Sequence, residues 1–267
     1  MTAARKTATL LAGGGVISAS AYMSYHYQRM ENNFAVKRSE KPTNFSFVHD
    51  PCRNEQFHTL ATSYDTCIGR DEFYLGINML RRILMHYHAH GDVLEVGAGT
   101  GRNIQYYPAA RVRRVLLTDR SDKMLAEARQ KVQRTTHSEH EVQYAFRTVD
   151  AEHLDLPADA FDTVVDTFGL CSYEDPVVVL NEMARVCKGK ILLLEHGRSH
   201  QWDFVTRHLD QHAEQHAANW GCVWNRDLDS ILERADVDVE ILSRYHFGTT
   251  YYVVCRPKGK KTETKSA

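Results

Sequence analysis

The middle of the chain alternates short apolar runs with stretches in which apolar residues recur at helical spacing. Seven runs have the length and composition of strands: Val93–Val96, Val112–Thr118, Val142–Thr148, Phe161–Asp166, Lys190–Glu195, Val237–Arg244 and Thr249–Arg256. Apolar strands that alternate with amphipathic helices are typical of a parallel sheet with crossover helices. The pattern therefore predicts one α/β domain, built on a seven-stranded, mostly parallel sheet, over residues 50–257.

Two local patterns predict helices beside this sheet. The segment Ser121–Gln133 places four apolar residues on one helix face: Met124, Leu125, Ala128 and Val132. Asp175 followed by Pro176 is the usual start of another helix, with an N-cap and a proline at the first helical position. The last two strands are separated by too few residues for a helix, so we expect them to form an antiparallel hairpin at the sheet edge.

The two ends of the chain lie outside this alternation. After a short basic end (residues 1–6), residues 7–25 contain no charged side chain; a helix rising ~1.5 Å per residue would nearly cross a ~30 Å hydrocarbon core over that length. A single N-terminal transmembrane helix is the first interpretation, and a cleaved signal or transit peptide is the alternative. Residues 26–49 are predicted to form a polar tether, and residues 258–267 a disordered basic tail.

The charges around the apolar segment suggest a compartment. The first thirty residues contain Arg5, Lys6 and Arg29 but no acid, which suits mitochondrial import better than secretion. More basic residues follow the apolar segment than precede it, so the domain lies on the positive side. We therefore expect a mitochondrial inner-membrane protein whose domain faces the matrix, where its cysteines would also stay reduced.

Composition excludes several partners and sites. The chain has 33 basic and 34 acidic residues and a formal net charge of -1, which gives no general reason to expect nucleic acid as a partner. Its six cysteines are scattered, without CxxC or Cys/His spacing. We therefore expect neither a metal site nor a disulfide framework.

The most informative stretch is Asp92–Asn103, which reads as a strand, a glycine-rich turn and the start of a helix. Gly97, Gly99 and Gly101 alternate through the turn, where left-handed backbone angles and a close ligand both favour residues without a Cβ. In the dinucleotide fingerprint another glycine would stand at Arg102. The spacing and the terminal hairpin argue against an NAD-dependent oxidoreductase and for S-adenosylmethionine (SAM), which has no pyrophosphate to seat at a helix N-terminus.

Acidic residues at successive strand ends support a SAM site. Asp119 ends the second strand, where its carboxylate can accept hydrogen bonds from both ribose hydroxyls. Asp150 ends the third strand and could accept from the adenine amino group, while the backbone of Ala151 offers an amide. Glu95 can reach the positively charged amino-acid end of SAM. Each acid alone is most simply a helix cap or a surface residue, but three at the edge where α/β sheets bind ligands favour a cofactor site.

Later segments of the chain carry a family resemblance. Leu194–Ser199, Trp220–Asp227 and Tyr245–Thr250 are similar to segments of the mitochondrial oligomycin-resistance-suppressor methyltransferase-like proteins. These belong to the ubiquinone-biosynthesis-type branch of class I SAM-dependent methyltransferases. The resemblance implies a Rossmann-like class I methyltransferase fold, SAM as the cofactor and a single inner-membrane anchor.

Three further residues, Tyr64, Asn103 and Thr167, are expected to contact the cofactor. In similar proteins the tyrosine at Tyr64 helps to cover the methionyl end of SAM, although a core tyrosine would look the same in this sequence. Asn103 closes the glycine segment and Thr167 ends the fourth strand; both complete the expected cofactor set.

No catalytic residue is assigned from the sequence, because methyl transfer needs little beyond positioning and the exclusion of water. His196, Asp210 and His216 could form a base with its orienting partner, or stabilise the helix between Gln201 and Asn219 and the loop that follows it. The leading hypothesis is a membrane-anchored enzyme that methylates a small or membrane-proximal acceptor. We expect no nucleic-acid partner for this enzyme. The alternative is a SAM-binding pseudoenzyme that assembles or stabilises a mitochondrial inner-membrane complex.

Overall fold

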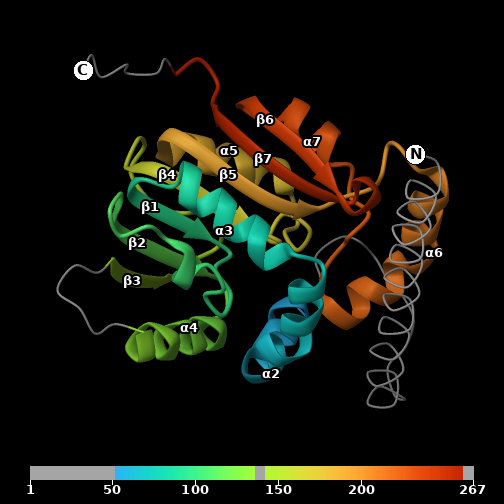
Figure 1. The fold of residues 1–267 in the computed structure, drawn as a ribbon, viewed down its shortest axis with the longest axis horizontal. Coiled ribbons are helices and arrows are strands. Elements are labelled where there is room, and N and C mark those ends of the chain that lie inside the picture. The colour runs from blue at the N-terminus through green and yellow to red at the C-terminus, as the bar shows by residue number, and fades with distance from the viewer. Residues whose placement is uncertain (1–51, 136–141, 261–267) are drawn as a thin grey trace, which may run out of the picture. The chain divides into compact units, whose positions relative to one another are not determined.

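A seven-stranded sheet forms the centre of the protein (Figure 1), in a computed structural model that describes residues 52–135 and 142–260. The strands are β1 (Gly91–Val96), β2 (Val112–Asp119), β3 (Gln143–Thr148), β4 (Phe161–Thr167), β5 (Cys187–His196), β6 (Val237–Tyr245) and β7 (Thr250–Pro257). Their order across the sheet is β3-β2-β1-β4-β5-β7-β6. All pairs are parallel except those of β7, which runs antiparallel to both β5 and β6. The predicted terminal hairpin is therefore confirmed.

Helices cover both faces of the sheet. Within the described residues they are α2 (Cys52–Tyr74), α3 (Ile77–His88), α4 (Asp122–Thr135), α5 (Pro176–Val186), α6 (Asp203–Trp220) and α7 (Leu228–Arg234). Apolar residues of α3 and α4 pack on one face of the sheet, and those of α5 and α7 pack on the other. Because the central strands are covered on both sides, β5 carries a run of four fully buried residues, Ile191–Leu194, instead of an alternating pattern.

The two helices predicted from local patterns are confirmed. In α4, Met124, Leu125 and Ala128 are buried, as its apolar stripe indicated. At the start of α5, the Asp175 carboxylate accepts hydrogen bonds from the amides of Val177 (2.9 Å) and Val178 (3.2 Å). These bonds satisfy amides that have no partner within the helix.

The prediction of a helix directly after the glycine turn is wrong. The chain instead makes further turns and one short 3-10 turn, η1 (Ile104–Tyr106), before an extended residue at Tyr107. Tyr107 precedes Pro108, and the proline ring disfavours helical angles in the residue before it. The glycine loop therefore joins β1 to β2 with only this short turn in place of a crossover helix.

Strand β5 also begins three residues earlier than predicted. Cys187 pairs with Phe161 of β4, and the register then shifts before Lys190. Gly189 permits this close approach, because a Cβ at that position would lie 2.2 Å from the Asp162 carbonyl oxygen. Residues 187–189, which precede the predicted strand, are thus its first part.

Several predictions fall on other parts of the chain. The basic end (1–6), the transmembrane helix (7–25) and the tether (26–49) lie outside the described residues. Within residues 52–135 and 142–260, no helix has the length and apolar composition needed to cross a bilayer. The first residues of the predicted tail pack on the domain, where Lys258 donates its amide to the Asp236 carbonyl (2.9 Å) and Lys260 Nζ donates to the Cys187 carbonyl (2.8 Å).

Candidate cofactor site

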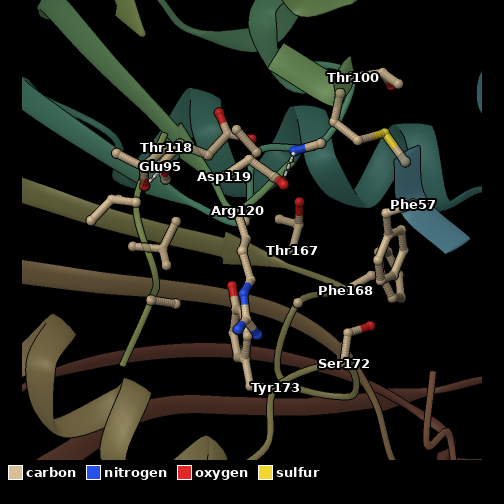
Figure 2. Close-up of a pocket in the computed structure, with 18 of the residues that line it drawn as sticks. Phe57, Glu95, Thr100, Thr118, Asp119, Arg120, Thr167, Phe168, Ser172 and Tyr173 are labelled. Carbon is tan, nitrogen blue, oxygen red and sulfur yellow. Dashed lines mark hydrogen bonds between the residues drawn. The ribbon is translucent and has the colours of Figure 1, made fainter. Parts of the chain in front are cut away.

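A cavity of about 460 Å³ opens where β1, β2 and β4 end and where the chain leaves β3 (Figure 2). Small-molecule sites commonly have this size and lie at this edge of an open α/β sheet. The residues predicted from the sequence that line it are Tyr64, Glu95, Gly97, Gly99, Asp119, Asp150, Ala151 and Thr167. The fold therefore brings most of the predicted cofactor residues to one cavity.

Gly101 and Asn103 do not line this cavity. Gly101 lines a second, polar cavity of about 390 Å³, which also includes Asp65 and Lys131. Asn103 is fully buried, and its side-chain amide donates to Glu95 (2.9 Å) and to Thr167 Oγ1 (2.9 Å). In this structure Asn103 therefore does not reach the cavity, and its side chain instead positions Glu95 and Thr167, which do line it.

The glycine turn needs glycine for different local reasons. Gly97 and Gly99 have φ of 60° and 55°, in the left-handed region that side chains disfavour. A Cβ on Gly97 would lie 2.3 Å from the Tyr173 hydroxyl, whereas a Cβ on Gly99 would meet nothing within 4 Å. Since Gly99 lines the cavity, a side chain there would enter the space open to a ligand.

Asp119 is fixed by backbone amides on both of its oxygens. Oδ2 accepts from the amide of Gly99 (2.8 Å) and Oδ1 accepts from the amide of Ser121 (2.8 Å), as the dashed line in Figure 2 shows for the first. Burial raises the pKa of Asp119, although these amides oppose the rise. Each oxygen keeps a second lone pair, so the carboxyl group can still accept from ligand hydroxyls.

Glu95 lies deeper, at the end of β1. It is 1% exposed and accepts hydrogen bonds from Asn103 Nδ2 and from the Tyr107 hydroxyl (2.6 Å). Burial raises the pKa of Glu95 to about 7, against the effect of these two donors. Glu95 therefore changes charge near neutral pH, within the cavity wall.

Arg81 of α3 supplies a buried cation to the wall that sequence reasoning missed. Its guanidinium pairs with Glu72 (2.8 Å), donates to Thr167 Oγ1 (2.6 Å) and lies over the ring of Phe168, with 5.0 Å to the ring centroid. An arginine here is suited to a ligand carboxylate such as that of a methionyl group. In the sequence Arg81 is one of several cations on an amphipathic helix, so no local signal marked it.

Arg102 connects the glycine turn to α2. Its guanidinium pairs with Glu72 (2.7 Å) and Asp65 (3.1 Å), and the Thr100 hydroxyl donates to Asp65 (2.7 Å). Arg102, which stands where a dinucleotide site would have a glycine, thus holds α2 beside the cavity. From this helix Tyr64 lines the wall, and burial raises its pKa.

The opposite wall comes from the loop after β4. Phe168, Ser172 and Tyr173 line it (Figure 2), and Phe168 has a left-handed φ of 61° that no sequence pattern announced. Behind the wall lies Asp166, fully buried, whose two oxygens have no hydrogen-bond partner of good geometry among the described residues. Burial raises the pKa of Asp166 well above its usual value, and the neighbouring carboxyl of Glu195 is raised in the same way.

The proposed base with an orienting partner is not assembled. Asp210 pairs with Arg198 (3.2 Å) and accepts from Asn225 Nδ2 (2.7 Å) on the surface. His216 stacks on Trp224 at 3.9 Å, and burial lowers the pKa of His196 to about 4. Asp210 therefore has a structural role, because it connects the loop after α6 to that helix.

One cluster of metal-ligand type occurs in the described part of the chain. Ligand atoms of His200, Asp227 and Asp229 lie within 4.8 Å of one another. Asp227 also caps α7 by accepting from the Ser230 amide (3.2 Å), and Asp229 pairs with Arg244. Helix capping and ion pairing account for these residues without a metal.

The cavity fits SAM in its sequence of chemical groups. Asp150 and Ala151 lie at one part of the wall, Asp119 at the next, and Glu95, Arg81 and Thr167 beside the glycine turn. This order matches acceptors for an adenine amine and ribose hydroxyls, followed by charged groups for an amino-acid end. The space beside Gly99 is open, and any side chain at this position would occupy it. A backbone that must lie close to a ligand is expected to have this property.

Comparisons with known proteins agree with this geometry. Residues 94–193 match the family described as "Methyltransferase domain". The chain is 38% identical to "Methyltransferase OMS1, mitochondrial" of Saccharomyces cerevisiae over 74% of this chain and 45% of that protein. It is 30% identical to the ubiquinone/menaquinone biosynthesis C-methyltransferase UbiE of Acidiphilium cryptum over 60% of this chain and 67% of that protein. The chain thus spans about half the length of the yeast relative.

A solved structure shows the same fold. A chain in the complex between the Haloferax volcanii Trm112 methyltransferase activator and a methyltransferase superposes with a TM-score of 0.59. The match covers 79% of this chain and 99% of that one, at 16% sequence identity. At this identity the likeness concerns the fold alone.

Proposed function

Since this chain belongs to the class I SAM-dependent methyltransferases, as its motifs predicted, we propose that it transfers the methyl group of SAM to a small or membrane-proximal acceptor. Family membership implies SAM as the cofactor. The observation that carries the proposal is the cavity wall in which Gly99 leaves open space and Asp119 is held by two backbone amides.

The chain's own contribution is orientation and the exclusion of water. Bound SAM would supply an electrophilic methyl group on its sulfonium. Asp119 would hold the ribose, while Arg81 and Glu95 would hold the methionyl end beside the glycine turn. Helix α2, fixed by Arg102, places Tyr64 and Phe57 on the cavity wall. Holding the two reactants in line in a closed site accounts for much of the rate of such a reaction.

The acceptor is proposed to approach from the wall of Phe168, Ser172 and Tyr173, which holds none of the predicted cofactor residues. We further propose that residues 7–25 anchor the protein in the mitochondrial inner membrane, with the domain in the matrix. This location is supported by the uncharged segment, by the basic first thirty residues and by the similarity to a yeast methyltransferase that is named as mitochondrial.

The activity is tested with the full chain purified in a mild detergent. We expect calorimetric titration to detect SAM binding, and labelled SAM to transfer its methyl group to a component of a mitochondrial extract. Binding without transfer to any component would favour the alternative, a SAM-binding pseudoenzyme that acts as an assembly factor. The absence of SAM binding would contradict both.

The location is tested by fractionation. Protease added to mitoplasts should leave the domain intact until the inner membrane is dissolved, and carbonate washing should leave the protein in the membrane pellet. Digestion in intact mitoplasts would reverse the orientation. Release by carbonate would show that residues 7–25 do not anchor the chain.

A further inference from the structure

Five large aromatic side chains are exposed at one end of the domain. Phe73 (69% exposed) and Tyr74 (63%) end α2, Trp202 (46%) and Phe204 (58%) begin α6, and Phe247 (49%) lies in the short turn η2 (His246–Gly248) between β6 and β7. We call these five residues the aromatic edge. Isolated exposed aromatics are common, but a group of them on one surface usually marks an interaction site.

Contacts bring these residues together from three separate segments. The Trp202 ring lies 5.9 Å from the Phe204 ring and 6.1 Å from the Phe247 ring. The rings of Phe73 and Tyr74 lie 5.6 Å apart. The two groups meet where His246 Nε2 contacts the Leu75 carbonyl oxygen at 2.9 Å, because His246 precedes Phe247 and Leu75 follows Tyr74.

The turn that presents Phe247 is strained and tightly held. His246 and Phe247 have φ of 51° and 58°, a region that residues other than glycine rarely adopt. His246 Nδ1 contacts Thr250 Oγ1 (2.9 Å), and the Ser199 hydroxyl donates to the Phe247 carbonyl (2.6 Å). Backbone strain of this kind persists only where its surroundings fix it, and it is concentrated at functional sites. Here it keeps an aromatic ring half-exposed.

The state of His246 fits this holding role. Burial lowers its pKa, so the imidazole is neutral at pH 7. A neutral ring has one N–H, and Nε2 must carry it because its partner, the Leu75 carbonyl, can only accept. Nδ1 is then free to accept from the Thr250 hydroxyl. A single tautomer therefore connects the β6–β7 turn to the end of α2.

From these observations we infer that the aromatic edge docks the domain on the surface of a lipid bilayer; this rests on the anchored location proposed above. Tyrosine and tryptophan favour the headgroup region, since each has an apolar body and a polar tip, and phenylalanine adds apolar area. The first turns of α6 expose both Asp203 and Arg207, one acid and one base. The first turns of α6 thus carry no excess charge that would require anionic lipid.

The length of chain before the described residues supports this occupant. The predicted anchor ends at Tyr25 and α2 begins at Cys52. The 26 residues between these points (26–51) can span at most roughly 90 Å, at ~3.3–3.6 Å per residue. A domain held that close to the bilayer has an effective concentration at its surface on the order of millimolar, so a small aromatic surface suffices for docking.

The docked surface adjoins the acceptor wall of the cavity. His196 lies opposite Thr250 in the β5–β7 ladder, and its ring lies 4.4 Å from that of Phe168, which lines the cavity. Thr250 in turn contacts His246 beside Phe247. Docking would therefore place the Phe168 side of the cavity near the lipid headgroups, where a membrane-proximal acceptor would be found.

The test uses fluorescence of the full chain reconstituted into phosphatidylcholine vesicles, with or without bromine on the lipid acyl chains. Bromine quenches only indoles that enter the lipid. Of the three tryptophans, Trp202 belongs to the aromatic edge, Trp220 lies at the far end of α6, and Trp224 donates Nε1 to the Leu209 carbonyl (3.0 Å). We expect brominated lipid to reduce emission, and Trp202→Phe to lower that loss by about twofold or more, as an interfacial indole would. Equal quenching in W202F, or none in either protein, would overturn the inference.

Two further variants keep the test independent of one residue. Phe204→Ser combined with Phe247→Asn should reduce the quenching, and asparagine tolerates the left-handed φ of position 247, so the turn is preserved. Tyr87→Ser is the matched control, because Tyr87 is 66% exposed on α3 outside the aromatic edge; its quenching should equal that of the parent. Quenching unchanged in the double variant would overturn the inference, as would concentration-dependent dimers that only the double variant abolishes.

The measurement is separate from the proposed function. It needs neither SAM nor an acceptor, and carbonate washing of the same vesicles reports the anchor alone. A carbonate-resistant, active protein without Trp202 quenching would overturn the docking surface and leave the proposed function intact.

Discussion

The two walls of the cavity differ in how their polar groups are satisfied. On the wall of the glycine turn, Asp119 accepts from two backbone amides, and Glu95 accepts from Asn103 and Tyr107. Behind the wall of the loop after β4, both oxygens of Asp166 and Oε2 of Glu195 have no hydrogen-bond partner of good geometry among the residues described, although the nearby Tyr173 hydroxyl acts to lower the pKa of Asp166. Buried polar groups are normally paired, so this difference needs a physical account.

The satisfied wall is organised before any ligand arrives. Its acceptors are fixed by two backbone amides at Asp119 and by two side-chain donors at Glu95, so a ligand pays little for ordering them. Behind the other wall, burial raises the pKa of Asp166 and Glu195 well above their usual values, which favours their uncharged, protonated forms. A neutral acid without a partner costs less than a buried charge without one. The cavity thus combines a preformed wall at the glycine turn with a wall after β4, behind which three buried carboxyl oxygens lack a hydrogen-bond partner of good geometry among the described residues.

The largest expected effect tests the preformed wall. Gly99→Val should lower SAM affinity by about 100-fold or more, because its branches would occupy the open space of the cradle. Calorimetric titration of the full chain measures the affinity, and circular dichroism reports folding. Gly76→Val is the matched control, since Gly76 also has a left-handed φ (69°) and open space but lies outside the cavity. Equal affinity in the two variants would remove the assignment of the cradle.

A smaller loss is expected at the ribose position. Asp119→Ala should weaken SAM binding by about 1.5–3 kcal/mol, the range for hydrogen bonds to charged groups. Titration with a deoxyribose analogue of SAM completes a thermodynamic cycle. If Asp119 holds the ribose, the analogue should show little further loss in the variant, whereas a full additional loss would place the ribose elsewhere.

Substitution of Asp166, behind the wall of the loop after β4, should change the stability of the protein and not its affinity for SAM. Asp166→Asn should raise the free energy of unfolding at pH 7 by about 1–3 kcal/mol, because the native acid keeps a proton that the unfolded chain has released. Asp162→Asn is a control of opposite sign. Burial acts to raise the pKa of Asp162, but the Asp92 amide and Lys188 outweigh it and lower the pKa.

Loss of Asp162 should therefore destabilise the protein at pH 7. Both variants are measured by urea unfolding in the same detergent. A large destabilisation by Asp166→Asn would mean that its carboxyl group is paired in the folded protein and that the contrast between the walls is wrong.

The smallest effect concerns Glu95, which is paired but still shifted in pKa to about 7 from an ordinary value of 4.5. Between these values the folded protein holds a proton that the unfolded chain has released, so stability falls as pH rises through this window. Glu95→Gln should remove about 1–3 kcal/mol of that fall. Urea unfolding from pH 4.5 to 7.5 measures the slope, and an unchanged slope would show that Glu95 titrates at its ordinary value.

Local patterns predicted the fold and the preformed wall better than the rest of the site. The strands, the terminal hairpin and the cap at Asp175 follow from the residues within each element. Gly99 was identified from the glycine spacing of one turn, and Asp119 because an acid at a strand end lies at the edge where α/β sheets bind ligands. The helix after the turn was wrong because Pro108, five residues beyond Asn103, acts on the backbone before it.

The remaining site residues come together only through tertiary packing. Arg81, on a helix before β1, reaches Thr167 at the end of β4, and Phe168 takes a left-handed backbone that its residue type does not favour. Neither has a short-range signal. The same is true of the aromatic edge, where Phe73 and Tyr74 of α2 meet residues of α6 and η2 that follow more than a hundred positions later.

The position of β7 has a consequence for how the chain is made. β7 is the last strand in sequence but lies between β5 and β6, so β5 gains its second neighbour only when residues 250–257 are present. A nascent chain that lacks them would present β5, with its apolar run Ile191–Leu194, as an open edge prone to aggregation. The sheet can therefore close only after residues 250–257 have been synthesised and released, and a chaperone that shields the β5 edge would act in that interval.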